Sequence, residues 1–380
     1  MSQVLGALSA VFWGLLVLSL LVFVHEGGHY LLARASSMRV TEFFLGLPCR
    51  WKLSYKSKKY GTEVGVTPFL LGGYTKICGM EGEEDPRLAS ALACVQRHGS
   101  VEVATVASEL GCELDEAYEL LATLVDWGSI RPFYNPELDE HEGQKDWPAA
   151  FQTIPRDAAW LTEYDRGHDF STPGSTVEGQ ARPVETSAED FLAQERTQTY
   201  LGKGFLPRVA ALLAGPFVNI LTAFLIVSLT LTIFGMDVAS QDGVWHWQPD
   251  LLRAMSFTFD YGVMVASKVA ELINPFKTME VLSQSSSIVG ISVMTSEAAK
   301  TGPIDLALMV AAISMSLGFM NLLPIPPLDG GKIVVEIVQL IIRRPLSIKA
   351  QNYVSYVGLA FFLFIFVVAL RNDIMKYILV

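Results

Sequence analysis

The sequence predicts an α-helical polytopic membrane protein with about four transmembrane helices, a membrane-associated β-hairpin and a small winged-helix-like α+β insertion. Two observations lead to this fold class. The first is a set of four uncharged apolar runs. The second is the charge distribution, because residues 81–200 hold 25 acidic and 8 basic side chains, whereas the rest of the 380-residue chain holds 14 acidic and 20 basic ones. A single uniform globular domain and a chain disordered throughout are both excluded by this contrast.

The apolar runs cover residues 1–24, 209–236, 306–328 and 351–370. Each is predicted to cross a membrane, because a transmembrane helix needs roughly 20 mainly apolar residues. The first run could instead be a signal peptide. It has no positively charged start, however, and no small-residue cleavage site follows it, so we favour a retained span.

Lysine and arginine beside the spans predict the orientation of the chain, because they accumulate in short cytoplasmic loops. They are Arg34, Arg39, Arg50, Lys52, Lys56, Lys58, Lys59 and Lys76 after the first run, Lys203 and Arg208 before the second, and Arg343, Arg344 and Lys349 after the third. Residues 237–250 contain neither type. We therefore expect a multi-pass protein of a bacterial inner or plasma membrane, with both termini outside and the acidic insertion in the cytoplasm. Arg371 and Lys376 count against this orientation but are outnumbered.

These patterns divide the chain into four predicted segments. Residues 1–82 hold the first span and the hairpin, 83–136 the winged-helix-like module, and 137–201 a polar, partly ordered linker. Residues 202–380 hold the remaining membrane core. Within that core, residues 251–299 mix apolar and charged positions and are expected to form an outer amphipathic segment.

An H-E-x-x-H motif stands at the end of the first apolar run, with His25, Glu26 and His29 as its defining residues. On a helix the two histidines lie one turn apart on one face and can bind one Zn²⁺, with the glutamate beside the metal's water. Ionisable side chains at membrane depth are costly, so they indicate a functional site. The alternative is a solvated helix end just outside the membrane.

A zinc site of this type needs a third protein ligand. Asp329 is the best candidate, because it follows a proline-rich break in the third span, within the sequence N-L-L-P-I-P-P-L-D-G-G at 321–331. Irregular backbone at membrane depth is tolerated where protein or a water-filled cavity surrounds it. The alternative is that Asp329 only caps the next helix.

Four motifs together resemble the site-2 protease family of intramembrane zinc metalloproteases. They are H-E-G-G-H at 25–29, G-G-Y-T-K at 72–76, A-G-P-F-V-N at 214–219 and N-x-x-P-x-P-x-L-D-G at 321–330. The resemblance covers residues 1–82 and about 202–372. It implies one Zn²⁺ held by His25, His29 and Asp329, Glu26 as the catalytic acid/base, and Asn321 as a contact to the substrate backbone.

Two features depart from the family pattern. Many bacterial members carry PDZ domains between the second and third spans, but the loop at about 235–251 is too short to hold one. The acidic insertion is not part of the family core either. Any screen of substrates by bulk must therefore lie elsewhere in this chain.

The residues also suggest a mechanism. Zn²⁺ lowers the pKa of a bound water to about 7 and polarises the scissile carbonyl, and Glu26 is expected to take the water's proton and deliver it to the leaving nitrogen. A transmembrane substrate must unwind first, and an extended peptide binds well to a strand edge. Residues 62–77 are predicted to form the receiving hairpin, and its substrate contacts are predicted at Val64, Val66, Gly72 and Gly73. A plain surface hairpin remains the alternative.

Small and amide side chains open the second span, at Gly215, Pro216 and Asn219. Small residues let membrane helices approach closely, and asparagine can bond across helices. We interpret these residues as structural rather than catalytic.

Within the insertion, the sequence predicts short helices at 88–98, 103–110 and 116–127, followed by an extended segment at 129–134. This order resembles a winged-helix module. Its second helix is acidic, so nucleic acid is not expected as a partner. A regulatory protein, or self-docking through residues 83–201, fits better. Aromatic residues in the linker are candidate anchors for it: Trp147, Phe151, Trp160, Tyr164 and Phe170.

The sequence thus predicts a zinc endopeptidase that cleaves transmembrane segments of single-span proteins in regulated intramembrane proteolysis. The family suggests membrane-tethered regulators, such as anti-sigma factors, or leftover signal peptides as substrates. A catalytically silent scaffold or chaperone of the same fold is the main alternative, and a zinc peptidase acting on prenylated or soluble peptides is another. The four cysteines, Cys49, Cys78, Cys94 and Cys112, form no C-x-x-C pair and are expected to be free thiols.

Overall fold

Four long apolar helices form the core of the computed structural model, and they are the helices among the described residues that are long and apolar enough to cross a membrane. They are α1 (Ser2–Ala35), α6 (Phe205–Phe234), α10 (Pro303–Asn321) and α12 (Ile348–Tyr377). The structure describes residues 2–57, 61–70, 72–80, 85–141, 143–144, 146–154, 178–181, 186–240, 243–274, 276–284, 286–344, 346 and 348–377. The prediction of about four spans is confirmed. The third helix ends at Asn321 rather than 328, because a proline-rich loop follows it.

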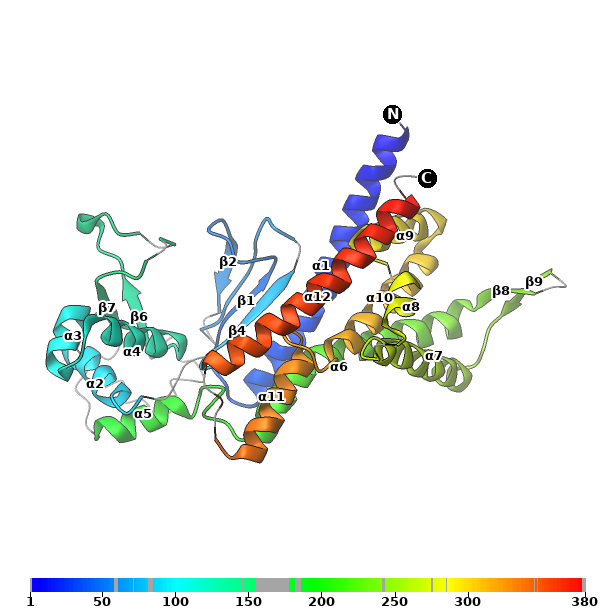
Figure 1. Cartoon of the computed structure of the whole chain (residues 1–380). Helices are drawn as coiled ribbons and strands as arrows, with labels where there is room; N and C mark the ends of the chain where they lie inside the picture. Colours follow the sequence, from blue (N-terminus) through cyan, green and yellow to red (C-terminus); the bar gives the residue numbers. More distant parts are fainter. Residues whose placement is uncertain are drawn as a thin grey trace.

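Helix α6 lies between α1 and α10 and packs on both (Figure 1). The helices approach closely where their side chains are small. A Cβ on Gly28 of α1 would lie 2.5 Å from the Ala214 carbonyl oxygen of α6. The prediction that small residues at the start of the second span serve close packing therefore agrees with the contact between these helices.

A β-hairpin precedes the predicted outer segment 251–299, and that segment forms three helices. The hairpin is β8 (Met236–Ser240) with β9 (Gly243–Trp247), and the helices are α7 (Leu251–Glu271), α8 (Thr278–Gln284) and α9 (Ile288–Thr301). Helix α9 packs along α1 and α10. The buried Asp373 of α12 accepts hydrogen bonds from the Ser287 and Gly290 backbone N–H groups, at 2.5 and 3.0 Å, and so ties the last span to the start of α9.

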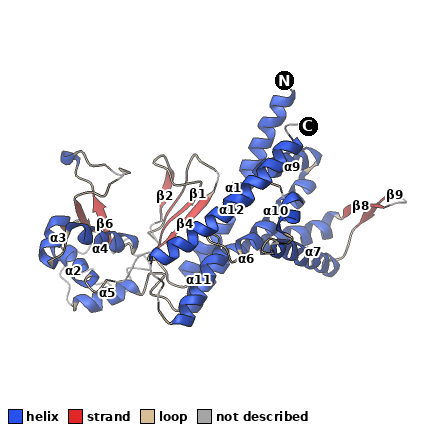
Figure 2. Ribbon diagram, viewed as in Figure 1, coloured by secondary structure: helices blue, strands red, loops and turns tan. Residues whose placement is uncertain are grey.

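A four-stranded sheet follows α1 and lies against it. Its strands are β1 (Val40–Leu45), β2 (Leu53–Lys56), β3 (Glu63–Val66) and β4 (Gly73–Ile77), in the order β2-β3-β1-β4. Strand β1 is parallel to β3 and antiparallel to β4. Figure 2 shows this sheet between the helical core and the insertion.

The predicted hairpin at 62–77 is therefore wrong in its pairing, because β1 lies between β3 and β4. The physical reason is the aromatic packing of β1. Phe43 stacks on Phe23 and Tyr30 of α1, with ring centroids 4.7 and 5.1 Å apart. This contact holds β1 in the middle of the sheet, and β4 is left as an edge strand on its other side.

The insertion folds around its own hydrophobic core. Its elements are α2 (Leu88–His98), β5 (Ser100–Glu102), α3 (Val103–Leu110), α4 (Leu114–Asp126), β6 (Ile130–Phe133), a 3-10 turn (Pro136–Leu138), β7 (Ala150–Thr153) and α5 (Ala188–Arg196). The three predicted helices and the extended segment after them are present. Their likeness to a winged helix stays a prediction.

Part of the predicted linker belongs to this module. Strand β7 lies between β5 and β6 in a three-stranded sheet, and its Phe151 is fully buried. Helix α5 packs on α2. The polar composition of 137–201 concealed these elements, because β7 is only four residues long and α5 is itself mostly polar. Trp160, Tyr164 and Phe170 lie outside the described residues.

Candidate metal centre

Two histidines of α1 face a common point near the cytoplasmic end predicted for this helix. His25 and His29 are one helical turn apart, and their Nε2 atoms are 3.2 Å from each other. Both side chains are buried. The apolar run carries the helix through the motif to Ala35, so the histidines hold their positions on a continuous helix rather than on a loop.

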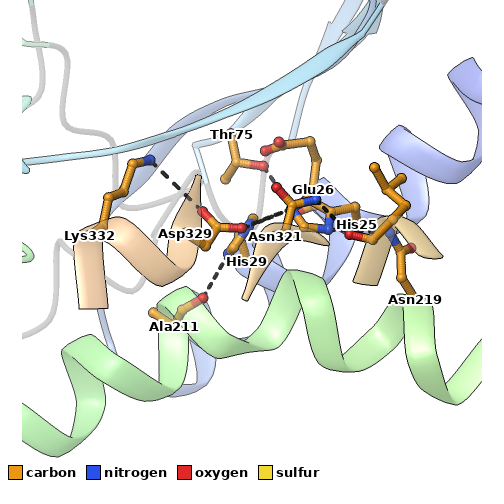
Figure 3. Close-up of polar contacts among 10 residues, drawn as sticks. His25, Glu26, His29, Thr75, Ala211, Asn219, Asn321, Asp329 and Lys332 are labelled. Carbon is orange, nitrogen blue, oxygen red and sulfur yellow. Dashed lines mark hydrogen bonds and ion pairs between the residues drawn. The ribbon is translucent and has the colours of Figure 1, made fainter. Parts of the chain in front are cut away.

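Asp329 completes this cluster from a distant part of the chain. It is the first residue of α11 (Asp329–Ile342), and its Oδ2 lies 3.0 Å from His25 Nε2 and 3.2 Å from His29 Nε2. Leu328 occupies the N-cap position of this helix, so Asp329 is not the helix cap. Figure 3 shows the three side chains converging, with Lys332 Nζ at 4.0 Å from the second carboxylate oxygen of Asp329.

The three atoms form a nearly equilateral triangle that fits a zinc ion. Zinc–nitrogen and zinc–oxygen bonds of 2.0–2.2 Å in a tetrahedral site place the ligand atoms at least about 3.3 Å apart. The observed separations of 3.0–3.2 Å are close to this value. Two neutral imidazoles and one carboxylate are also the kind of ligand set found in catalytic zinc sites.

The outer ring nitrogens are held by α6, and this arrangement favours metal binding through Nε2. His29 Nδ1 donates to the Ala211 carbonyl oxygen at 2.7 Å. His25 Nδ1 lies 3.3 Å from the Asn219 side-chain amide, whose Oδ1 is buried without a hydrogen-bond partner. With the amide turned so that Oδ1 faces His25, it would accept the Nδ1 proton. Both Nε2 lone pairs would then point to the centre of the triangle.

The absence of a side chain at Gly215 of α6 leaves room for the ligand atoms of His25 and His29. A Cβ at this position would touch His29 Nε2 and would lie 2.8 Å from His25 Nε2. Any side chain here would therefore occupy the place where the ligand atoms converge. Sequence reasoning treated Gly215 as a packing residue only.

The family model described as "Peptidase family M50" matches residues 13–365. The chain belongs to this family. It is a membrane zinc metalloendopeptidase, and the resemblance to site-2 proteases is confirmed.

Individual relatives agree with this membership. The chain is 26% identical over 369 residues to the "Putative zinc metalloprotease" of Helicobacter pylori, covering 95% of this chain and 98% of the relative. It is 33% identical over 154 residues to the "Regulator of sigma-W protease RasP" of Bacillus subtilis, covering 40% of this chain and 34% of the relative. It is 25% identical over 390 residues to "Putative zinc metalloprotease R01501" of Rhizobium meliloti, covering 95% of each. Zinc is therefore the cofactor of this M50 peptidase.

Glu26 lies next to the cluster on the side of the sheet. It is half-buried, and its backbone carbonyl accepts a hydrogen bond from Thr75 Oγ1 of β4 at 3.0 Å. A Cβ on Gly73 would lie 3.4 Å from Glu26 Cγ, so the start of β4 passes directly beside this side chain. The edge strand thus adjoins the motif of the M50 peptidase.

The residues predicted to bind the substrate differ in their distance from the metal cluster. Asn321 ends α10 beside the cluster, where its side-chain amide donates to the Leu317 carbonyl oxygen at 3.0 Å (Figure 3). Val64 and Val66 lie on β3, which is paired on one side with β1 and on the other with β2. The prediction that they offer a strand edge is wrong, because their strand has no unpaired edge.

Sequence reasoning missed three contacts of the cluster. The backbone carbonyl of Ala211 contacts His29, and the side-chain amide of Asn219 contacts His25. The hydroxyl of Thr75 contacts the backbone of Glu26. Only Asn219 carried a usable signal, since it is a polar side chain within an uncharged span.

Proposed function

We propose that this protein is an intramembrane endopeptidase that cleaves the transmembrane segments of single-span membrane proteins. Its zinc would be held by His25, His29 and Asp329, and Glu26 would act as general base and acid. One observation carries the proposal, namely the buried triangle of ligand atoms beside Glu26 at one end of a helix of membrane length. Polar groups placed in this way are costly unless they coordinate an ion.

Each residue of the site has a separate role in the proposed reaction. A zinc ion held by His25, His29 and Asp329 would supply Lewis acidity to the scissile carbonyl and to water. Glu26 accepts a proton from water and returns it to the amide nitrogen as the peptide bond breaks. Asn219 and the Ala211 carbonyl orient the two imidazoles, and Lys332 lies near the Asp329 carboxylate and favours its ionised form.

A substrate peptide would bind beside β4 rather than β3. Strand β4 has an edge away from β1, and its first residue, Gly73, passes beside Glu26. An extended backbone added there would be held by main-chain hydrogen bonds close to the zinc ligands. Gly72 and Gly73 leave room for this approach, and Asn321 lies across the cluster as a second contact to the substrate backbone.

The membrane orientation is part of the proposal. The site residues come from the C-terminal ends of α1 and α10, the N-terminal part of α6 and the start of α11, all near one end of the bundle. The two chain termini lie together at the other end (Figure 1). This arrangement agrees with four crossings, both termini outside and the site near the cytoplasmic side, where the basic flanks place it.

The name of one relative supports a substrate class for this proposal. The Bacillus subtilis relative is named as a regulator of sigma-W, so membrane-tethered regulators are the class that we propose. Cells that carry an inactive variant should accumulate membrane-span fragments that wild-type cells do not. Comparing the fragments in the two kinds of cell would identify the substrates.

Cleavage and metal content together test this function. The full chain should cleave a single-span reporter within its span, and Asp329→Ala should lower both the bound zinc and the cleavage. A silent scaffold would bind zinc without cleaving the reporter. A peptidase of soluble or prenylated peptides would cleave those and leave the span intact. Unchanged zinc in Asp329→Ala would remove Asp329 from the ligand set.

A further inference from the structure

A second group of metal-binding side chains lies in the insertion, separate from the proposed catalytic zinc site. It consists of Cys94 and His98 of α2 and Glu109 of α3. Figure 1 shows these helices at the far end of the module from α1 and α11, which hold the catalytic cluster. The two groups share no residue, so a metal here would be independent of the active site.

The spacing of this group could accommodate a metal ion. Cys94 and His98 are four residues apart and lie on the same face of α2. The Cys94 Sγ, a ring nitrogen of His98 and a carboxylate oxygen of Glu109 all lie within 4.8 Å of one another. His98 Nε2 is 2.8 Å from Glu109 Oε1. A tetrahedral zinc ion places nitrogen and oxygen ligands about 3.3 Å apart, so a small shift of exposed side chains opens the site.

The surroundings favour a divalent cation of intermediate softness. Arg97 donates to the other carboxylate oxygen of Glu109 at 2.9 Å, which fixes the carboxylate and leaves Oε1 facing His98. A thiolate and a carboxylate together balance two positive charges, and imidazole adds a neutral ligand. Thiolate with imidazole selects zinc over magnesium or calcium. Cys94 is fully buried, whereas His98 and Glu109 are 40% and 33% exposed, so an ion can enter from solvent.

We propose that Cys94, His98 and Glu109 form a zinc-binding site on the insertion, in addition to the catalytic zinc. The ion joins α2 to α3 and keeps a fourth position open on the exposed side. Binding releases the thiol proton of Cys94 to solvent, because only the thiolate is a ligand. Whether α2 and α3 are joined by the ion then depends on the concentration of free zinc.

Cobalt(II) distinguishes this site from the catalytic one in the full-length protein. A thiolate bound to cobalt gives an intense near-ultraviolet charge-transfer band that nitrogen and oxygen ligands do not give. The ligands proposed for the catalytic zinc include no sulfur. The detergent-purified chain, stripped of metal and titrated with cobalt(II), should therefore develop the band through Cys94 alone, whatever the outcome at Asp329.

Matched variants test the assignment. Cys94→Ser should lose the band and bind one metal ion fewer than the wild type. Cys112→Ser, which changes a half-buried cysteine packed against the same core, should keep both. His98→Ala truncates a side chain that is 40% exposed, and should weaken cobalt binding at least about tenfold. The absence of a band in the wild type, or a band that survives in Cys94→Ser, would overturn the proposal. So would unchanged cobalt affinity in His98→Ala.

Discussion

Arg39 and Glu195 form a buried ion pair that joins the insertion to the catalytic core. The Arg39 Nη1 lies 2.9 Å from Glu195 Oε2, and both residues are almost completely shielded from solvent. The same guanidinium donates to the Trp127 carbonyl oxygen at 2.8 Å. Arg39 directly precedes β1, whereas Trp127 and Glu195 belong to the module. This contact supports the predicted self-docking of the insertion. It lies at the end of the sheet where Val40 pairs with Ile77, whereas Gly73, beside Glu26, lies at the other end of β4.

Loss of Arg39 should release the module. A buried carboxylate that loses its partner costs about 3–5 kcal/mol. Cys78 reports on this, because a Cβ on Gly128 of the module would lie 3.2 Å from its Sγ. Burial raises the pKa of the Cys78 thiol to about 11, so the wild type should react slowly with a maleimide at pH 8, and faster by about tenfold per pH unit up to that pKa.

Arg39→Ala should expose Cys78 and accelerate its labelling at pH 8, measured by mass spectrometry of the modified peptide. Lys52→Ala removes an exposed ion pair with Glu63 and serves as the control. The positive charge of Arg39 favours the Cys78 thiolate. If the module stayed docked in Arg39→Ala, loss of this charge would therefore leave Cys78 no more reactive than in the wild type. Equal or slower labelling in Arg39→Ala would therefore contradict a docking role for the ion pair.

Asn219 should act as a positioning residue for His25. Asn219→Ala removes the partner of His25 Nδ1 and should weaken zinc binding by about 10–100-fold, as the loss of such a supporting contact typically does. Competition with a chelator measures this affinity. Ser228→Ala removes another buried hydrogen bond of α6, to Thr258, and should leave zinc affinity unchanged. Equal affinities in the two variants would rule out the role of Asn219.

Gly215 should be intolerant of even a methyl group. Gly215→Ala places a Cβ against His25 and His29, so it should lower bound zinc and reporter cleavage together. Gly262→Ala is the control, because its Cβ would make an ordinary contact with Met315 at 3.7 Å. Metal analysis of the two purified proteins gives the comparison. Full zinc in Gly215→Ala would mean that the cluster has more space than this geometry allows.

The substrate strand should lie along β4. In a Glu26→Gln background that keeps the substrate bound, a cysteine substituted for the exposed Lys76 of β4 should form a disulfide with a cysteine in the reporter span. Tyr55→Cys on β2, the opposite edge of the same sheet, should not. Cross-linking at β2 but not at β4 would place the substrate on the other edge.

The parts of this fold that the sequence predicts are those set by local pattern. Uncharged runs mark the four spans, and the H-E-x-x-H spacing places His25 and His29 on one helix face. A carboxylate after three prolines is unusual at membrane depth, and this pattern indicates Asp329 as a ligand. These signals need no knowledge of distant contacts.

The parts that the sequence did not predict depend on tertiary pairing. The strand order is decided by the stacking of Phe43 on Phe23 and Tyr30, which periodicity in residues 62–77 does not reveal. Strand β7 is recognisable only once it lies between β5 and β6. The contact of Asn219 with His25 depends on the close approach of α1 and α6, so from the sequence this residue could be interpreted only as structural.

Glu26→Gln tests the central claim most directly. The variant keeps the size and shape of the side chain but removes its ability to accept and return a proton. Purified wild type and variant would be compared for bound zinc and for cleavage of a single-span reporter in detergent or vesicles. We predict the same zinc content and a loss of cleavage of at least about a hundredfold. Undiminished cleavage by the zinc-loaded variant would contradict the proposed mechanism.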